Sequence, residues 1–303
     1  MYKNCFTRAT PGLIIFMIDQ SASMSQIGYE GRPLAETAAD IINRMIAELG
    51  LIFTCGNNIK DSANIVILGY GGTKDSMEVE LLRSGSIKIL CTDETIPVQH
   101  LKQMIPDGAG GTITIDLELK QFVTPKAVWK KPMGNAFALV SALVNEWTIR
   151  GKGTLDEDGN PFTRDDSLDP VPLIINISDG EPIDCEADVR KYASEIMDIN
   201  CPDGNPLIVN ILTTANESDC IFLPTAKELD ELQGRKIIKD SSSNLPNELI
   251  NTFKGAGFVD ACKDSKLVLI NPSNDDIGKL TTSLEYSLMI GDMGKVDPTN
   301  IPR

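Results

Sequence analysis

The sequence predicts an α/β fold with a mostly parallel central sheet and helices on both faces. Runs of apolar, often β-branched residues alternate with longer segments of helical periodicity, which is the pattern of strand–helix–strand units. The runs are apolar at consecutive positions, as expected of strands that are buried on both faces. Two of them end in an aspartate, at the edge where open sheets of this kind bind ligands.

Four long apolar runs are the predicted core strands. They occupy residues 13–18, 63–70, 172–178 and 206–213. A shorter run at 266–272 predicts one further strand. Connections between parallel strands need a crossover, so a helix is expected between successive runs.

The helices follow from apolar spacing. The clearest covers 33–50, where Pro33 suits the first turn and Gly50 suits the end. Its apolar side chains recur every three or four residues, at Ala38, Ile41, Ile42, Met45, Ile46 and Leu49. Further helices are expected at 133–151, 185–200, 244–257 and 275–291.

The remaining segments predict one domain with insertions. We expect a single domain over 10–290, with insertions near 73–128, 151–170 and 216–260, and a C-terminal tail at 291–303. Within the first insertion, the pieces at 86–91 and 112–123 resemble strands on either side of a glycine-rich loop. Trp129 and Trp147, on either side of the helix start near 133, are interpreted as core packing.

Composition excludes several classes of function. The net charge of −15 over 303 residues disfavours nucleic acid and anionic membranes as partners. No apolar stretch reaches 18 residues, and the N-terminus lacks the apolar core of a signal peptide. Seven scattered cysteines, never spaced C-x-x-C, indicate thiols in a reducing compartment. We therefore expect a cytoplasmic protein with no membrane or nucleic-acid partner.

The first aspartate opens a cluster of oxygen donors. In the stretch "DQSAS", Asp19, Ser21 and Ser23 alternate, so an extended loop places them on the same side. Asp179, in "SDG", ends a neighbouring predicted strand and adds a second carboxylate. Carboxylates and hydroxyls are ligands for Mg²⁺, and Ca²⁺ or Mn²⁺ would also fit such a set. The alternative is structural, since Asp and Ser also form turns and helix caps.

These residues carry a family resemblance. "IIFMIDQSASM" followed by "IINISDGEPID" resembles the von Willebrand factor A domain family, whose fold is Rossmann-like and doubly wound. The residues of these two motifs are most similar to those of intracellular bacterial members, including those associated with tellurite resistance and stress. The resemblance implies a metal-ion-dependent adhesion site, with Asp19, Ser21, Ser23 and Asp179 as its metal ligands.

One residue departs from the family pattern. The family has a threonine ligand before the helix at 133–151, whereas the matching stretch "KPMGNAF" begins with Lys131. An ammonium cannot ligate a metal. Lys131 either points outward or lies against Asp19 and Asp179 in place of the cation. Thr112 and Thr124 are possible substitutes for the missing ligand, although neither precedes a suitable helix.

Three functions follow as expectations. The first is a non-enzymatic module in which the metal recruits an acidic residue of a protein partner. The second is a Mg²⁺-dependent phosphohydrolase. Near the motifs, however, the sequence has no D-x-D nucleophile pair, no phosphate loop and no general-base histidine. The third is a metal-free scaffold of the same fold, with Lys131 in the cation's place.

Overall fold

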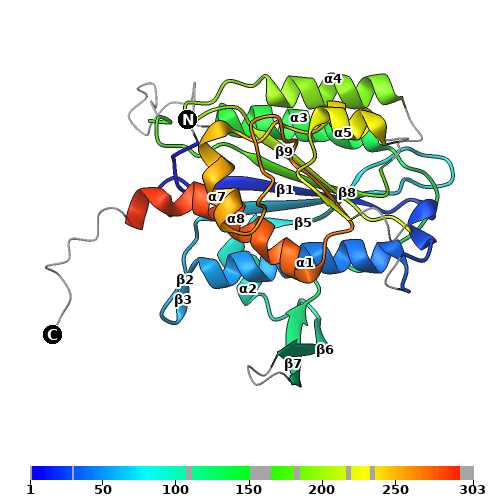
Figure 1. Cartoon of the computed structure of the whole chain (residues 1–303), viewed down its shortest axis with the longest axis horizontal. Helices are drawn as coiled ribbons and strands as arrows, with labels where there is room; N and C mark the ends of the chain where they lie inside the picture. The colour runs from blue at the N-terminus through cyan, green and yellow to red at the C-terminus, as the bar shows by residue number, and fades with distance from the viewer. Residues whose placement is uncertain are drawn as a thin grey trace, which may run out of the picture.

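The fold is a central sheet between two layers of helices (Figure 1). The computed structural model of the chain describes residues 2–28, 31–106, 111–150, 165–180, 185–215, 220–232 and 236–293. None of the described helices is long and apolar enough to cross a membrane.

The sheet has seven strands in the order β10-β11-β9-β8-β1-β4-β5. Their bounds are β1 Gly12–Asp19, β4 Ala63–Tyr70, β5 Glu80–Ser86, β8 Leu173–Ser178, β9 Leu207–Leu212, β10 Ile221–Phe222 and β11 Val268–Ile270. The inner strands pair in parallel, whereas β5 and β10 at the two edges are antiparallel to their neighbours. The prediction of an α/β, Rossmann-like, mostly parallel sheet is confirmed.

Strand β1 lies inside the sheet because both of its faces are apolar. Ile14, Phe16 and Ile18 pack into one hydrophobic cluster, and the alternate residues Leu13, Ile15 and Met17 pack into the other. It pairs with β4 on one side and β8 on the other. The end of β1 is therefore covered from both faces, and its last residue, Asp19, is buried.

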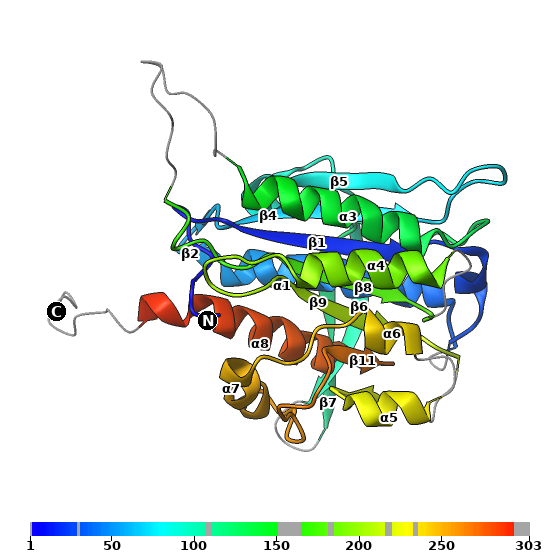
Figure 2. The same cartoon turned by 90° about the horizontal axis from the view of Figure 1, so that it is seen from above.

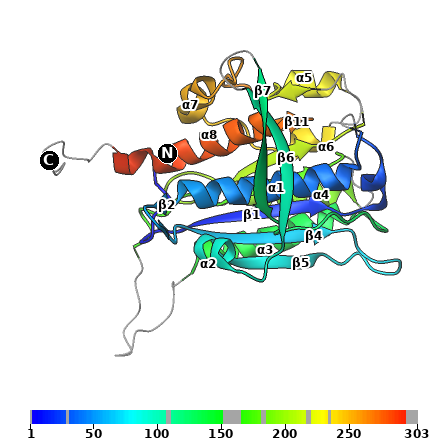
Figure 3. The same cartoon turned by 90° about the horizontal axis from the view of Figure 1, so that it is seen from below.

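The helices divide between the two faces of the sheet. On one face lie α1 Leu34–Ile52, α2 Ile87–Thr92, α7 Ile250–Gly255 and α8 Asn274–Met293 (Figure 3). On the other lie α3 Met133–Thr148, α4 Glu186–Met197, α5 Ala226–Glu231 and α6 Lys236–Asp240 (Figure 2). Helix α1 confirms the prediction for 33–50, and it buries Ile42, Met45 and Ile46.

Two predictions for the minor elements are corrected. The strand predicted at 86–91 is wrong, because Ile87–Thr92 forms α2, whose first turn is capped by the Ser86 hydroxyl. Its two buried side chains, Ile87 and Leu90, are three residues apart, which suits a helix and not a strand. The predicted helix at 244–257 is shorter, with the 3₁₀ turn η2 Asn247–Leu249 leading into α7.

A long hairpin extends from the α1 side of the body. Strands β6 Val98–Pro106 and β7 Thr112–Lys120 pair antiparallel with each other and not with the main sheet (Figure 1). The predicted strand at 112–123 thus corresponds to β7. A smaller hairpin of β2 Thr54–Cys55 and β3 Asn58–Ile59 follows α1. Residues 107–110 of the glycine-rich loop lie outside the described residues.

Candidate functional site

Two carboxylates meet at the C-terminal edge of the sheet. Ile18 of β1 lies beside Ile177 of β8 in parallel register, so the residues that follow them emerge side by side. Asp19 is the last residue of β1, and Asp179 comes directly after β8. Both were predicted from the sequence to lie at this edge, and the strand register brings them together.

Lys131 lies between these carboxylates. Its Nζ is 3.0 Å from Asp19 Oδ2 and also contacts Asp179 Oδ1. The Asp19 side chain is 0% exposed, that of Lys131 2% and that of Asp179 17%. The sequence allowed Lys131 to point outward or to lie against Asp19 and Asp179. In the structure it lies against the two aspartates. The three residues form what we call the Asp–Lys–Asp triad.

The triad depends on the segment that leads into α3, residues 124–132, which we call the strap. Val128 N–H donates to the Gln20 carbonyl at 2.7 Å, and Lys130 N–H donates to the Gly71 carbonyl at 2.8 Å. These bonds fasten the strap to the residues that follow β1 and β4. Lys131 comes directly after them and therefore enters the gap between the strand ends.

The two serines complete the β1 side of the site. Ser21 N–H donates to Asp19 Oδ1 at 2.8 Å, and the Ser21 and Ser23 hydroxyls are 3.0 Å apart. Ser21 is buried, whereas Ser23 is half-exposed in the 3₁₀ turn η1 Ala22–Ser25. The predicted alternate spacing thus brings both hydroxyls to one side. Ser21, the serine nearer to Asp19, is held there by its backbone hydrogen bond to the carboxylate.

Burial and the charge of Lys131 shift the pKa of Asp19 in opposite directions. Burial raises its pKa above the ordinary 3.8, the neighbouring Lys131 ammonium lowers it, and Asp179 raises it again. Burial also raises the pKa of Tyr70 well above 10.0, and both aspartates add to the effect. The ionised form of Asp19 therefore depends on Lys131 as its counter-charge.

These residues do not fit a metal ion. The point between the two carboxylates is taken by a cationic nitrogen, which repels a second cation and offers it no lone pair. Within the described ranges, no group of three His, Cys, Asp or Glu side chains is placed to hold a metal. Thr112 lies in the projecting hairpin and Thr124 is exposed on the strap, so neither replaces the missing ligand.

A buried neutral network borders the triad and was missed from sequence. The Tyr70 hydroxyl donates to Asn176 Oδ1 at 2.8 Å, and Asn176 Nδ2 donates to Asn210 Oδ1 at 2.7 Å. Asn210 Nδ2 donates to Ser242 Oγ at 2.8 Å, and that hydroxyl donates to the Ile238 carbonyl at 2.6 Å. We call these residues the amide ladder. The sequence does contain a sign of this network, because a single asparagine interrupts each of two otherwise apolar strands, Asn176 in one and Asn210 in the other.

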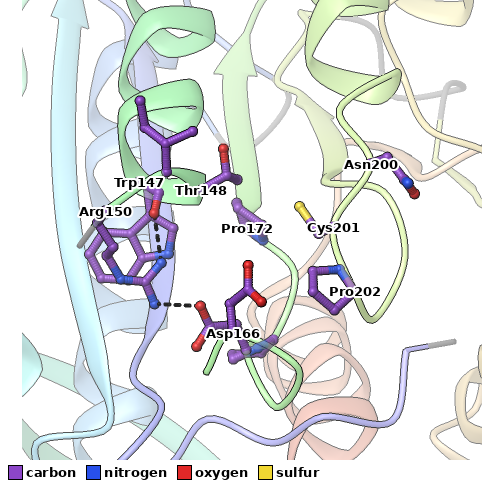
Figure 4. Close-up of a pocket in the computed structure, with 11 residues that line it drawn as sticks. Trp147, Thr148, Arg150, Asp166, Pro172, Asn200, Cys201 and Pro202 are labelled. Carbon is purple, nitrogen blue, oxygen red and sulfur yellow. Dashed lines mark hydrogen bonds and ion pairs between the residues drawn. The ribbon is translucent and has the colours of Figure 1, made fainter. Parts of the chain in front are cut away.

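A separate pocket of about 440 Å³ lies at the other end of α3 (Figure 4). The Arg150 guanidinium stacks 3.7 Å above the Trp147 ring and forms an ion pair with Asp169 at 3.1 Å. Trp147 is partly buried against the core, as predicted, whereas Trp129 is 59% exposed, so its predicted core packing is wrong. The pocket holds none of the triad residues.

The solved structures named here are distant likenesses of the chain. No family model and no curated protein matches the chain. Manganese-loaded TRAP from Plasmodium vivax is 13% identical over 94% of this chain and 74% of that one, with a TM-score of 0.41. The VWA domain of SpRpn10 is 10% identical over 89% and 93%, with a TM-score of 0.39. The type V pili tip protein Mfa5 from Porphyromonas gingivalis is 14% identical over 57% and 20%, with a TM-score of 0.30. At these scores they carry no argument about the site, and the fold assignment depends on the strand order and register above.

Proposed function

We propose that this chain is a non-enzymatic protein-binding module of the von Willebrand factor A type that works without a metal ion. In it, the Lys131 ammonium takes the place of the divalent cation and holds the loops of the sheet edge in one arrangement. The cytoplasmic setting and the link to bacterial stress complexes remain part of the proposal, and both depend on the resemblance of the two motifs.

The proposal rests on the contrast between two side chains of the strap, one buried and one exposed. On its inner side, Lys131 neutralises Asp19 and Asp179 and is almost fully buried. On its outer side, Trp129 is 59% exposed. Tryptophan is enriched among the residues that dominate binding energy at protein interfaces. The strap is fastened to the sheet by two backbone hydrogen bonds on either side of Trp129, and a contact residue held in this way loses less entropy on binding.

The adjoining loop adds a second apolar side chain. Ile27, just after η1, is 56% exposed. Its loop meets the strap through the pairing of Ser21 with Val128. Ile27 is therefore a second exposed apolar residue that a partner contacting both loops would meet.

The expected role of an acidic partner residue changes accordingly. In the metal-dependent version, a partner carboxylate completes the metal's coordination. Here the cation is Lys131, which is 2% exposed and already contacts two carboxylates, so an incoming carboxylate cannot reach it. We propose that the partner is recognised by the exposed face of the two loops instead.

A binding screen with a matched variant tests this proposal. Proteins retained by the wild type but not by Trp129→Ala are expected to bind equally with excess Mg²⁺ and with a chelator. Ile149→Ala is the control, because Ile149 is similarly exposed but lies at the opposite end of α3. Retention that requires Mg²⁺, or that is unchanged in Trp129→Ala, contradicts the proposal. Mg²⁺-dependent hydrolysis of an aryl phosphate by the wild type would favour the phosphohydrolase.

A further inference from the structure

The two faces of the projecting hairpin differ in polarity. Strands β6 and β7 pair residue by residue over their whole length, and alternate pairs along such a ribbon share a face. One face, which we call the apolar face, comprises the pairs Gln99 with Leu119, Leu101 with Leu117, Gln103 with Ile115, and Ile105 with Ile113. The other, the polar face, comprises Val98 with Lys120, His100 with Glu118, Lys102 with Asp116, Met104 with Thr114, and Pro106 with Thr112.

The body of the protein covers the base of the apolar face but not the part nearer the tip. At the base, Leu119 is buried, and Gln99 Nε2 donates to Asp40 Oδ1 of α1 at 3.3 Å. Ile113, on the same face nearer the tip, is 49% exposed. A groove of about 760 Å³ lies where the hairpin leaves α1 and α8, and its walls include Leu51, Gly278 and Leu119 (Figure 3). The apolar face therefore extends beyond the part that packs on α1.

A two-stranded ribbon with an open apolar face gains stability when another layer covers that face, because an isolated hairpin is only marginally stable in water. We propose that the cover is the apolar face of a second copy of this chain, so that two hairpins pack face to face in a dimer. In a two-fold dimer each copy presents the same patch to the other. An aliphatic patch is complementary to itself, and the four strands then form two packed layers.

The distribution of charge favours a second copy as the partner. The net charge of −15 makes most of the surface repel another copy, and it also disfavours an anionic membrane as the cover. The pairs of the apolar face contain no charged residue, whereas Lys102, Asp116 and Glu118 all belong to the polar face. Two apolar faces therefore meet without bringing like charges together. A second copy also matches this face in length and polarity.

The size of the face sets the expected strength of the dimer. The nine residues of β7 span roughly 30 Å, and the two strands lie about 4.8 Å apart. Such a narrow contact is at the small end of the range for protein interfaces, so the dimer should dissociate on dilution. It uses a different surface from the strap, and it therefore goes beyond the proposed function.

Sedimentation velocity of the full chain tests this dimer. The wild type is expected to shift from monomer to dimer as its concentration rises to roughly 100 µM, because interfaces of this size class are weak. Ile113→Asp places a charge on the apolar face and is expected to remain monomeric over the same range. Thr114→Asp is the matched control, since Thr114 is also exposed but belongs to the polar face, and it is expected to dimerise like the wild type. Circular dichroism establishes that each variant is folded.

Each other outcome overturns the proposal. A wild type that stays monomeric leaves the apolar face to some other partner, and a dimer that survives Ile113→Asp uses another surface. Loss of the dimer in both hairpin variants would show that the apolar face is not what is recognised. Association beyond two copies is also excluded, because a two-fold contact closes on itself.

A further pair of measurements keeps this proposal separate from the function proposed for the strap. Trp129→Ala is expected to dimerise like the wild type, and a monomeric Trp129→Ala would move the contact to the strap and overturn the hairpin dimer. Ile113→Asp is expected to retain the proteins that the wild type binds through Trp129. Failure of the hairpin dimer would thus leave the binding screen with Trp129→Ala unaffected.

Discussion

The Asp–Lys–Asp triad and the amide ladder are both buried polar groups at the same sheet, but they are stabilised differently. In the ladder, the donors and acceptors of Tyr70, Asn176 and Asn210 are all neutral. In the triad, two carboxylates depend on one ammonium. Removing one ladder residue leaves unsatisfied hydrogen bonds, whereas removing the central lysine leaves buried charges. The cost of burying an unpaired charge is the larger of the two.

The largest expected effect is that of Lys131→Met. It keeps the length of the side chain but leaves the buried Asp19 and the partly buried Asp179 without a counter-charge, which should lower the free energy of unfolding by about 3–5 kcal/mol at neutral pH. Chemical denaturation measures the difference. Lys126→Met, which breaks the surface pair with Glu80, should change stability by less than about 1 kcal/mol. Equal losses in the two variants would mean that the triad is no stronger than a surface pair.

The effect of Lys131→Met should also depend on pH. Burial raises the pKa of Asp19 above 3.8, and removal of Lys131 takes away the main influence that lowers it. The folded state then binds the proton more tightly than the unfolded chain. Protonation of Asp19 therefore stabilises the folded variant. This stabilisation is fully present below pH 3.8 and is lost as the pH rises through the pKa of Asp19 in the folded state. The gap between wild type and variant should therefore widen from acid to neutral pH, and a constant gap would contradict this explanation.

Asn176→Ala should have an intermediate effect that does not depend on pH. It removes the acceptor for the Tyr70 hydroxyl and the donor to Asn210. Leaving a buried group unsatisfied typically costs about 1–3 kcal/mol, and the loss for Asn176→Ala is expected to be of this size. Denaturation at several pH values measures the loss. A loss that grows between acid and neutral pH would show that the ladder and the triad titrate together.

Ser23→Ala should have the smallest effect. The Ser23 hydroxyl is half-exposed and contacts Ser21 at 3.0 Å, so water can replace it. The expected loss of stability is about 0.5–1.5 kcal/mol, measured by thermal or chemical unfolding. If the loss matched that of Lys131→Met, the hydroxyl pair would have to be part of the charge balance of the triad.

Sequence could predict the parts of the site that depend on strands. Consecutive apolar residues placed β1 and β8 inside the sheet, and adjacent parallel strands necessarily bring Asp19 and Asp179 to one edge. The orientation of Lys131 could not be predicted, because it depends on strap hydrogen bonds to Gln20 and Gly71, far away in sequence.

The other differences have equally local causes. Helix α2 has six residues, too few for its periodicity to outweigh the β-branched side chains within it. The amide ladder depends on the register that places Asn176 beside Asn210, and no single run reveals that pairing. Trp129 looked like a core residue because tryptophan is large and apolar. Its exposure follows from the path of the strap, in which the next residue but one, Lys131, points inward.

The central claim, that Lys131 fills the place of a divalent cation, is tested most directly by calorimetric titration of Mg²⁺ and Mn²⁺ into the wild type and Lys131→Thr. Threonine removes the ammonium and adds a hydroxyl ligand beside Asp19, Ser21, Ser23 and Asp179. We predict no saturable binding to the wild type and saturable 1:1 binding to the variant. Saturable binding to the wild type, or identical titrations of the two proteins, would contradict the claim.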